Sequence, residues 1–288
     1  MSAALRIPPL LRAAAEDDER DDWLAALPGV VKQAADHWGL EIAAPYEPGG
    51  ECAWVAPART PDGADVVVKV GWPHPESEHE SAGLALWAGE GVVRLLDDIA
   101  ADSVQVLLLE RCLPGAALSH AADPAKCDDV IAGLLLRLRR RPPAAHPFRP
   151  LAVMCAEWAD AAGRRLITSV LPDRELIRTG IALFRTLPQT ATEQVVLFTD
   201  LHSDNVLAAQ REPWLAIDPK PYVGDPCYDV LQHLLNTRLA QDPRGAAERM
   251  AGLAELDAPR VREWLFARCA IEAVDEPSWF EVVRALAP

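Results

Sequence analysis

The sequence predicts an α+β protein of two lobes: a smaller lobe that combines helices with a mainly antiparallel sheet, and a larger, mostly helical lobe. Three observations support this prediction. Four short runs of β-favouring residues fall between residues 51 and 110. Beyond residue 116, apolar residues recur mainly at helical spacing. Between the two regions, Pro114 and Gly115 break the pattern, and a chain of 288 residues is long enough for two cores.

The smaller lobe is placed at residues 1–110, followed by a hinge at residues 111–115. It begins with two helical patterns, each of which has a proline at its start. A turn signal, "TPDGAD", separates the first two strands and indicates a hairpin. A single helix is expected between the second and third strands. The expected helices are 8–27, 28–40 and 74–89, and the expected strands are 51–59, 65–70, 91–97 and 104–110.

The larger lobe is placed at residues 116–288. One strand pair interrupts its helices: "VVL" leads in at residues 195–197, and a hairpin over 205–209 and 213–218 turns at Gln210-Arg211-Glu212. The expected helices are 124–140, 150–168, 173–187, 225–240, 244–256 and 259–275.

Composition limits the possible partners. The net charge of −15 provides no basic footprint for nucleic acid, whereas an acidic surface attracts cationic small molecules. No segment approaches the length of a membrane helix, and Met1 to Leu11 contains no signal-peptide apolar run. The six cysteines form no Cys-x-x-Cys pair, which argues against a zinc site and a disulfide framework. We therefore expect a cytoplasmic protein, a monomer, that binds neither nucleic acid nor membranes.

Acids and amides concentrate around the predicted hairpin. Antiparallel pairing brings Asn205 and Asp218 to the same end of the ribbon, where a carboxylate and an amide oxygen can hold Mg²⁺ beside phosphate oxygens. Asp200, in the preceding loop, would be free to accept a proton from a hydroxyl nucleophile. The same stretch also allows a second hypothesis, a metal-dependent phosphoesterase built from Asp200, His202, Asp204 and Asp218.

The motifs resemble a known family. Asp200-x-x-x-x-Asn205 followed by Asp218 resembles the catalytic loop and metal-binding aspartate of the protein-kinase-like fold. The segments "TDLHSDNVL", "WLAIDPK" and "VGDPCYD" are most similar to the aminoglycoside/hydroxyurea antibiotic resistance kinases, which include streptomycin kinases. The similarity continues through "WAGEGVVRLL" and "LLLERCLPGAAL" and so covers most of the chain.

The resemblance implies roles in catalysis and metal binding. Asp200 would be the catalytic base, and Asn205 and Asp218 would bind Mg²⁺. Lys69, in "DVVVKV", would grip the α- and β-phosphates of the nucleotide. Its expected partner is Glu80, which shares one helix face with Leu84 and Trp87.

It also implies a hinge at Glu110, Arg111 and Cys112, whose backbone would pair with the nucleobase of ATP or GTP. The glycine loop that usually covers the phosphates matches weakly, so the choice of donor stays open. Phe198-Thr199 replaces the His-Arg or His-Gly that usually precedes the base, and the sequence offers no physical account of it.

The implied activity is transfer of the γ-phosphoryl group to a hydroxyl of a cationic small molecule. An aminoglycoside antibiotic is the expected acceptor, with resistance as the outcome; a sugar or a hydroxyurea-like compound is the alternative. Candidates to line the acceptor pocket are Asp229, Glu263 and Glu272, although Asp229 could equally face the catalytic loop. Lys220 is a candidate contact of the γ-phosphate.

Overall fold

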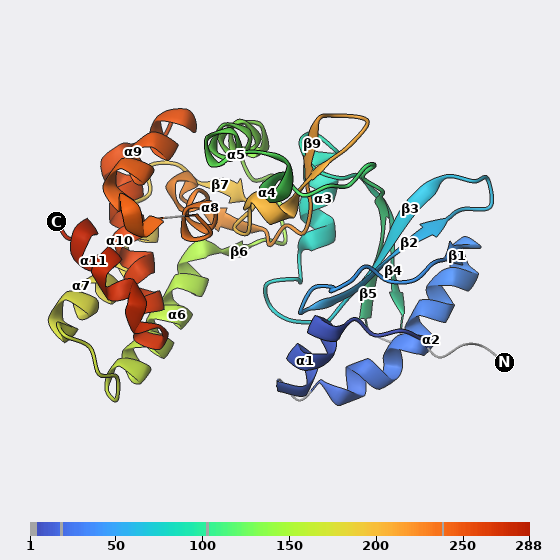
Figure 1. Ribbon diagram of the computed structural model, residues 1–288, viewed down its shortest axis with the longest axis horizontal. Coiled ribbons are helices and arrows are strands. Elements are labelled where there is room, and N and C mark those ends of the chain that lie inside the picture. Colours follow the sequence, from blue (N-terminus) through green and yellow to red (C-terminus); the bar gives the residue numbers. More distant parts are fainter. Residues whose placement is uncertain (1–4, 18–19, 102–103, 238) are drawn as a thin grey trace. The chain divides into compact units, whose positions relative to one another are not determined.

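The computed structural model describes residues 5–17, 20–101, 104–237 and 239–288. The chain divides into two compact units, Met1–Gly115 and Ala116–Pro288 (Figure 1). Positions 18–19 of the first predicted helix, and position 238 of the helix predicted at 225–240, lie outside the described residues. None of the described helices combines the length and the hydropathy that crossing a membrane requires.

Unit 1 is built on a five-stranded sheet with the strand order β1-β2-β3-β5-β4, in which every neighbouring pair is antiparallel. Short hairpins suffice to connect antiparallel neighbours, whereas the β3–β4 connection carries helix α3. The elements are α1 (Pro9–Asp17), α2 (Asp21–Trp38), β1 (Glu41–Ile42), β2 (Ala53–Arg59), β3 (Asp65–Gly71), α3 (Glu80–Trp87), β4 (Leu95–Ala101) and β5 (Val104–Glu110).

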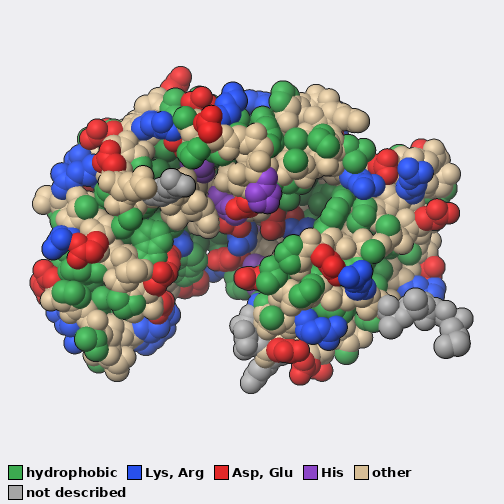
Figure 2. All heavy atoms as spheres, viewed as in Figure 1, with side chains coloured by type: hydrophobic (Ala, Val, Ile, Leu, Met, Phe, Trp, Pro, Cys, Tyr) green, Lys and Arg blue, Asp and Glu red, His purple; other side chains and the backbone are tan. Residues whose placement is uncertain are grey.

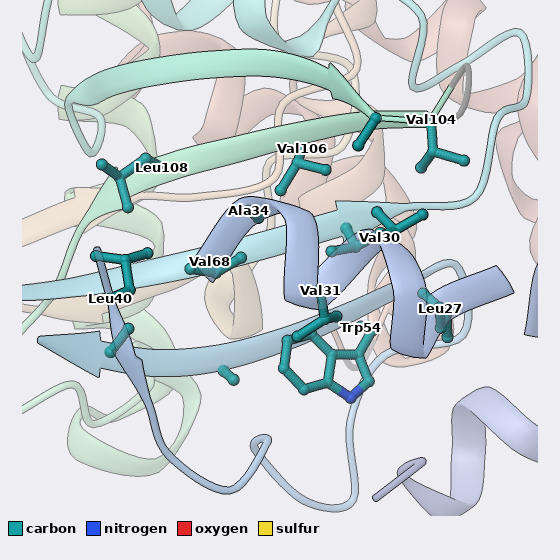
Figure 3. Packing of buried hydrophobic residues seen from close by; sticks show 14 of the residues in the cluster. Leu27, Val30, Val31, Ala34, Leu40, Trp54, Val68, Val104, Val106 and Leu108 are labelled. Carbon is teal, nitrogen blue, oxygen red and sulfur yellow. The ribbon is translucent and has the colours of Figure 1, made fainter. Parts of the chain in front are cut away.

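The core of unit 1 lies between α2 and one face of this sheet. Figure 3 shows Leu27, Val30 and Val31 of the helix beside Val68 of β3 and Trp54 of β2. Because side chains alternate along a strand, Val66, Val68 and Val70 point into this core and Lys69 points to the opposite face. The alternation thus places the lysine on the face of the sheet away from α2.

Several boundaries in unit 1 differ from the prediction. The helix predicted at 8–27 is divided between α1 and the start of α2, the helix predicted at 74–89 begins only at Glu80, and β1 was not predicted. A helix was expected to start at Pro28, but α2 runs through it, because Trp23 and Leu27 before the proline and Val30 after it form one buried stripe. Tertiary burial therefore offsets the backbone hydrogen bond that an interior proline loses. The predicted strand at 91–97 is instead β4, Leu95–Ala101. As an edge strand it exposes Asp97 and Asp98, so its pattern is too polar to be recognised.

Unit 2 is mostly helical and contains two small sheets, one with the order β6-β10-β7 and one formed by β8 and β9. Its longer helices are α5 (Pro124–Leu138), α6 (Leu151–Leu166), α7 (Arg174–Thr186), α9 (Pro243–Leu253) and α10 (Ala258–Asp275). Its short helices are α4 (Leu118–Ala121), η1 (Leu187–Thr190), η2 (Ser203–Asn205), η3 (Pro226–Tyr228), α8 (Leu231–Leu235), η4 (Leu239–Gln241), η5 (Pro277–Trp279) and α11 (Phe280–Leu286). Its strands are β6 (Arg149–Pro150), β7 (Val195–Leu197), β8 (Val206–Ala208), β9 (Trp214–Ala216) and β10 (Tyr222–Gly224).

Aspartates begin several of these helices. The side chains of Asp123, Asp173, Asp242 and Asp257 each accept a hydrogen bond from a backbone N–H in the first turn of α5, α7, α9 and α10. Proline follows in the first turn of α5, α9 and α10, where its missing N–H costs nothing. These local signals explain why the starts of α5, α7, α9 and α10 were predicted to within a residue.

The helix predicted at 225–240 is instead divided into η3, α8 and η4. The strand β10 was not predicted, and neither were β6 and α11. The strands β6 and β10 are short. Strand β10 pairs with β7 and β6, which are distant from it in sequence. Pairing of this kind leaves little local signal.

A close contact between α7 and α10 at Gly180 allows a stability test. A Cβ atom on Gly180 would lie 2.3 Å from the Cβ of Ala270. Gly180→Ala is therefore expected to lower the free energy of unfolding by about 1–3 kcal/mol through overpacking. The matched control is Gly163→Ala in α6, where no atom apart from the chain neighbours and the backbone of the helix itself lies within 4 Å of the added Cβ.

The control is expected to raise the free energy of unfolding by up to about 1 kcal/mol, because alanine favours the helix. Urea unfolding of the two variants measures both changes. Equal effects at the two positions would contradict the close packing of α7 on α10.

The surface is acidic in sum but mixed in detail. The net charge is −15, yet Figure 2 shows acidic and basic side chains interspersed over the face that it draws. The net negative charge of the whole protein, and not one acidic patch on this face, would therefore attract a cationic ligand.

Candidate active site

The hairpin of β8 and β9 brings the candidate metal ligands together. Val206 pairs with Ala216 in this hairpin, and the N–H of Ile217 donates to the carbonyl of Asn205 at 2.9 Å. Asn205 therefore lies at the end of the ribbon where the chain leaves β9 for Asp218. The backbone pairing of this hairpin thus brings the amide of Asn205 and the carboxylate of Asp218 to the same end of the ribbon.

The side chain of Asn205 is oriented by Asp200. Its Nδ2 donates to the carbonyl oxygen of Asp200 at 3.0 Å and lies 3.4 Å from Oδ2 of the same residue. With the amide nitrogen used in this way, the amide oxygen is the atom that a cation would contact. An amide oxygen and the carboxylate of Asp218 are ligands suited to Mg²⁺, so the donor set fits this ion.

Asp200 is a half-buried carboxylate paired with a lysine. Its side chain is 15% exposed, and its Oδ2 lies 3.1 Å from Nζ of Lys220. Burial raises the pKa of Asp200, while the positive charge of Lys220 opposes the rise and the negative charge of Asp218 adds to it. A carboxylate whose pKa is raised in this way is a stronger proton acceptor than an exposed one.

The two residues before Asp200 are held by Asp229. The N–H of Phe198 donates to Oδ2 of Asp229 at 2.9 Å, and the N–H of Thr199 donates to Oδ1 at 2.6 Å. Thr199 has a φ of 59°, a conformation that costs about 1–2 kcal/mol for a residue other than glycine. Asp229 fixes that conformation, and the Thr199 hydroxyl donates to the carbonyl of Lys220.

These contacts explain Phe198-Thr199, for which the sequence offered no account. Phe198 is fully buried and anchors the loop in the core. Thr199 supplies a hydroxyl to the backbone that follows Asp218, which itself has a φ of 60°. The pair thus connects the strand β7 to both halves of the site.

Asp229 therefore faces the catalytic loop, which was one of its two expected orientations. Its side chain is buried, with 8% of the residue exposed, and both carboxylate oxygens accept backbone N–H groups. Burial raises its pKa to about 6, although the two hydrogen bonds act to lower it. Both oxygens are thus engaged by the loop.

The pH dependence of stability tests this burial. The folded protein retains a proton on Asp229 up to about pH 6, whereas the unfolded chain releases it near 3.8. Between these values the folded state binds more protons, so the contribution of Asp229 to the free energy of unfolding falls by about 3 kcal/mol as the pH rises. Asp229→Asn removes this titration.

The expected result is that the unfolding free energy of the wild type, minus that of Asp229→Asn, decreases between pH 4 and pH 7. Urea unfolding at several pH values measures it, with both proteins in the same buffers. A difference that is constant or rises with pH would contradict the assignment.

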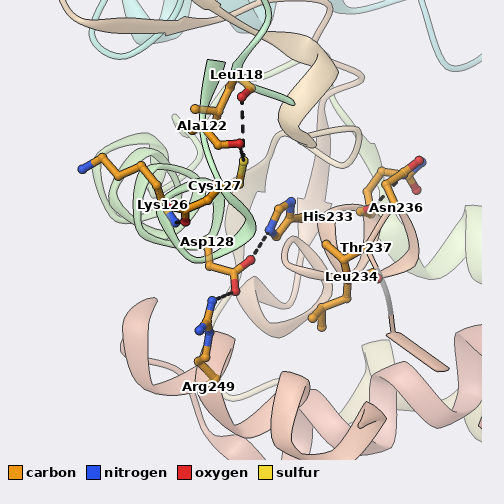
Figure 4. A network of polar contacts seen from close by, with 12 residues as sticks. Leu118, Ala122, Lys126, Cys127, Asp128, His233, Leu234, Asn236, Thr237 and Arg249 are labelled. Carbon is orange, nitrogen blue, oxygen red and sulfur yellow. Dashed lines mark hydrogen bonds and ion pairs between the residues drawn. The ribbon is translucent and has the colours of Figure 1, made fainter. Parts of the chain in front are cut away.

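Helix α8, which follows Asp229, is linked through side-chain contacts to α5 and α9. Figure 4 shows the carboxylate of Asp128, on α5, between the ring of His233 on α8 and the guanidinium of Arg249 on α9. The Nε2 of His233 lies 2.6 Å from Oδ1 of Asp128, and His233 is 1% exposed. These contacts fix α8, and with it the segment that carries Asp229 four residues earlier.

Unit 1 contributes a buried ion pair on β3 and α3. The Nζ of Lys69 lies 2.7 Å from each carboxylate oxygen of Glu80, and their side chains are 10% and 5% exposed. Glu80, the expected partner, is thus in contact with Lys69. The two residues help to line a cavity of about 450 Å³, together with Leu107 and the stacked rings of Trp72 and His74.

The segment predicted as a hinge follows β5. The side chain of Glu110 accepts a hydrogen bond from the N–H of Arg94 at 3.0 Å, and Arg111 forms an ion pair with Asp65 at 2.9 Å. Cys112 is buried. The side chains of these residues are thus held by unit 1.

The remaining candidates lie on α10 and in the loop between Asp200 and Asn205. Glu272 pairs with Arg268, four residues earlier on α10, at 2.6 Å, and Glu263 is exposed on the same helix. Asp204 is exposed and accepts a hydrogen bond from the hydroxyl of Ser119, while Nδ1 of His202 lies 3.6 Å from Asp204. Within the described parts of the chain, no three His, Cys, Asp or Glu side chains gather as a metal cluster.

Two features of the site were not predicted from the sequence. The ion pair of Lys220 with Asp200 joins residues 20 positions apart, and only the nearness of Lys220 to Asp218 in "IDPK" could have suggested it. The left-handed conformation of Thr199 has no signal in its residue type.

A five-stranded antiparallel unit with a buried Lys–Glu pair, followed by a helical unit with this hairpin, defines the class of protein-kinase-like small-molecule kinases. Solved structures agree on the fold. An amicoumacin kinase, hAmiN, in complex with AMP-PNP, Ca²⁺ and Ami aligns with a TM-score of 0.61 at 14% identity, covering 90% of this chain and 91% of that one. The prediction of a two-lobe, kinase-like α+β fold is confirmed.

The chain belongs to the aminoglycoside/hydroxyurea antibiotic resistance kinase family, whose model matches residues 41–279. A hydroxyurea phosphotransferase of Kitasatospora aureofaciens is 36% identical over 254 residues, 86% of this chain and 72% of that protein. A streptomycin 6-kinase of Streptomyces glaucescens is 36% identical over 233 residues, 80% of this chain and 74% of that protein. The family resemblance inferred from the sequence is confirmed: the chain is a kinase that uses a nucleotide, and the phosphoesterase hypothesis is set aside.

Proposed function

We propose that this protein transfers the γ-phosphoryl group of ATP or GTP to a hydroxyl of an aminoglycoside of the streptomycin type, and thereby confers resistance. The observation that carries the proposal is the half-buried Asp200 beside Asn205, with Asp218 at the end of the same hairpin. This arrangement supplies a proton acceptor and a set of magnesium ligands from one short segment.

In this proposal, Asp200 accepts the hydrogen bond and then the proton of the acceptor hydroxyl. Asn205 and Asp218 hold Mg²⁺, which offsets the charge of the phosphate oxygens when it is bound. Asp229 holds the backbone of Phe198 and Thr199, and this fixes the position of the loop at Asp200. Asp229 is thus assigned to the positioning of this loop and not to the acceptor pocket.

The nucleotide is assigned to unit 1. Lys69 binds the α- and β-phosphates, and Glu80 fixes the position of its ammonium group. The cavity beside this pair supports the assignment, because a phosphate chain needs room next to a buried cation. The backbone of the hinge at Glu110, Arg111 and Cys112 pairs with the nucleobase.

The net charge of this protein and the names of its streptomycin kinase relatives both support a cationic acceptor. With a net charge of −15, the protein attracts a polycation such as streptomycin, and Glu263 and Glu272 are acids on α10 that such a cation could contact. Addition of a phosphate inverts the local charge of the antibiotic and so weakens its fit to an anionic RNA. This is how transfer to the hydroxyl gives resistance.

A second candidate acceptor is hydroxyurea, which is favoured by the 36% identity to a hydroxyurea phosphotransferase. Hydroxyurea is small and uncharged, so it would gain nothing from the acidic surface. The kinetics of the two acceptors should therefore respond differently to salt.

The acceptor class is tested with labelled ATP, Mg²⁺ and separate reactions with streptomycin, hydroxyurea and glucose. The expected result is label in streptomycin, with kcat/KM falling as salt is raised. Label in hydroxyurea or glucose alone, with no effect of salt, would replace the proposed acceptor and leave the kinase assignment in place.

A further inference from the structure

Lys220 lies at the meeting point of the catalytic loop and the segment that follows Asp218. Its N–H donates to the carbonyl of Phe198 at 3.0 Å, and its carbonyl accepts the hydroxyl of Thr199. The chain turns sharply just before it, because Asp218 has a φ of 60°. Two hydrogen bonds thus fasten the backbone of Lys220 to the two residues that precede Asp200.

With its backbone held in this way, Lys220 places its ammonium group next to Asp200. The Nζ of Lys220 lies 3.1 Å from Oδ2 of Asp200, with side-chain exposures of 30% and 15%. Both residues belong to unit 2, so the contact does not depend on how the two units are placed. An exposed surface pair would be worth little, but this one joins two half-buried groups on anchored backbone.

The position also lies within reach of a transferring phosphoryl group. An acceptor hydroxyl bound to Asp200 lies about 3 Å from the carboxylate, and the phosphorus must approach that hydroxyl to about 3–3.5 Å. The oxygens of the phosphoryl group therefore come close to the place that the Lys220 ammonium occupies. The sequence of unit 2 contains one other lysine, Lys126, which is exposed on α5.

We propose that Lys220 is a catalytic cation with two successive partners: Asp200 in the free enzyme, and the γ-phosphoryl group once nucleotide and acceptor are bound. The change of partner frees the carboxylate of Asp200 for the acceptor hydroxyl. It also places a positive charge on the oxygens of the group in transfer, where such charge lowers the barrier. The inference rests on the proposed role of Asp200.

The acceptor oxygen forms a bond to the γ-phosphorus, and the bond from phosphorus to the β–γ bridging oxygen breaks with its electron pair left on the nucleoside diphosphate. The hydroxyl proton passes to Asp200. Lys220 stays protonated throughout and contributes charge only.

The test compares Lys220→Met and Lys220→Arg with the matched control Lys126→Met, all in the full chain. Single-turnover transfer from labelled ATP to the acceptor measures the chemical step, and titrations give the affinities for ATP and acceptor. Lys220→Met is expected to slow the step by about 10²–10³-fold. The two affinities should stay within about threefold of the wild type.

Lys220→Arg keeps the charge and is expected to recover at least about tenfold of the lost rate. Lys126→Met should react like the wild type. Transfer by Lys220→Met at the wild-type rate would overturn the proposal. So would a lowered rate that comes with a lowered thermal midpoint and no recovery in Lys220→Arg, because the lysine would then act only on the fold.

Asp200→Asn, assayed in parallel, separates the role of Lys220 from the role of Asp200. If Asp200→Asn is inactive and Lys220→Met is normal, only the role of Lys220 fails. If Asp200→Asn is itself active, the proposed function of Asp200 fails first, and the role of Lys220 fails with it.

Discussion

Asp200→Asn is expected to lower the rate of phosphoryl transfer by about 10²–10⁴-fold, the usual contribution of a positioned general base. An amide cannot accept the hydroxyl proton, although it keeps the size of the side chain and its hydrogen-bonding neighbours Asn205 and Lys220. Binding of ATP should change little, because the nucleotide is assigned to Lys69 and the hinge of unit 1. Steady-state kinetics and an ATP titration measure the two effects separately.

Asp204→Asn provides the matched control for this change. Asp204 lies in the same loop and has the same chemistry, but it is exposed and accepts a hydrogen bond from the hydroxyl of Ser119. We expect kcat within about threefold of the wild type. Equal losses at positions 200 and 204 would show that charge in the loop matters in general, and that Asp200 has no special role.

Lys69→Met is expected to lower the free energy of unfolding by about 3–5 kcal/mol, the usual loss when one partner of a buried ion pair is removed. The cost arises because Glu80, whose side chain is 5% exposed, would keep a carboxylate in the interior without its partner charge. In the double variant Lys69→Met/Glu80→Gln the buried charge is gone, so its loss should be smaller than that of Lys69→Met alone.

Urea unfolding of the wild type, both single variants and the double variant completes the cycle. The control is Lys32→Met, which removes a lysine from an ion pair whose side chains are 74% and 67% exposed and should cost no more than about 1 kcal/mol. A loss at Lys69 no larger than the loss at Lys32 would contradict the burial of the pair. Transfer activity of Lys69→Met should fall as well, since the phosphates lose their cation.

The parts of the site that could be predicted are those with short-range causes. Asn205 precedes the first strand of one tight hairpin and Asp218 follows the second, so antiparallel pairing alone was enough to bring them to the same end of the ribbon. Glu80 was chosen as the partner of Lys69 from its place on one face of a helix, and the two are in contact in the structure. The helices that start with an aspartate cap were found for the same local reason.

The parts that could not be predicted depend on contacts between distant segments. Pro28 would end a helix by local rules, yet burial on both sides of it keeps α2 continuous. Strand β10 exists because β7 and β6 pair with it. The conformation of Thr199 is imposed by Asp229, 30 positions further on, and no preference of threonine indicates it.

We propose that this chain moves a phosphoryl group from a nucleotide to a hydroxyl of a streptomycin-type antibiotic. Phosphorus NMR of one reaction with ATP, Mg²⁺ and streptomycin tests it most directly. We expect ADP and a phosphomonoester on the antibiotic in equal amounts, with neither formed by Asp200→Asn. Release of inorganic phosphate alone, or the same phosphomonoester from Asp200→Asn, would contradict it.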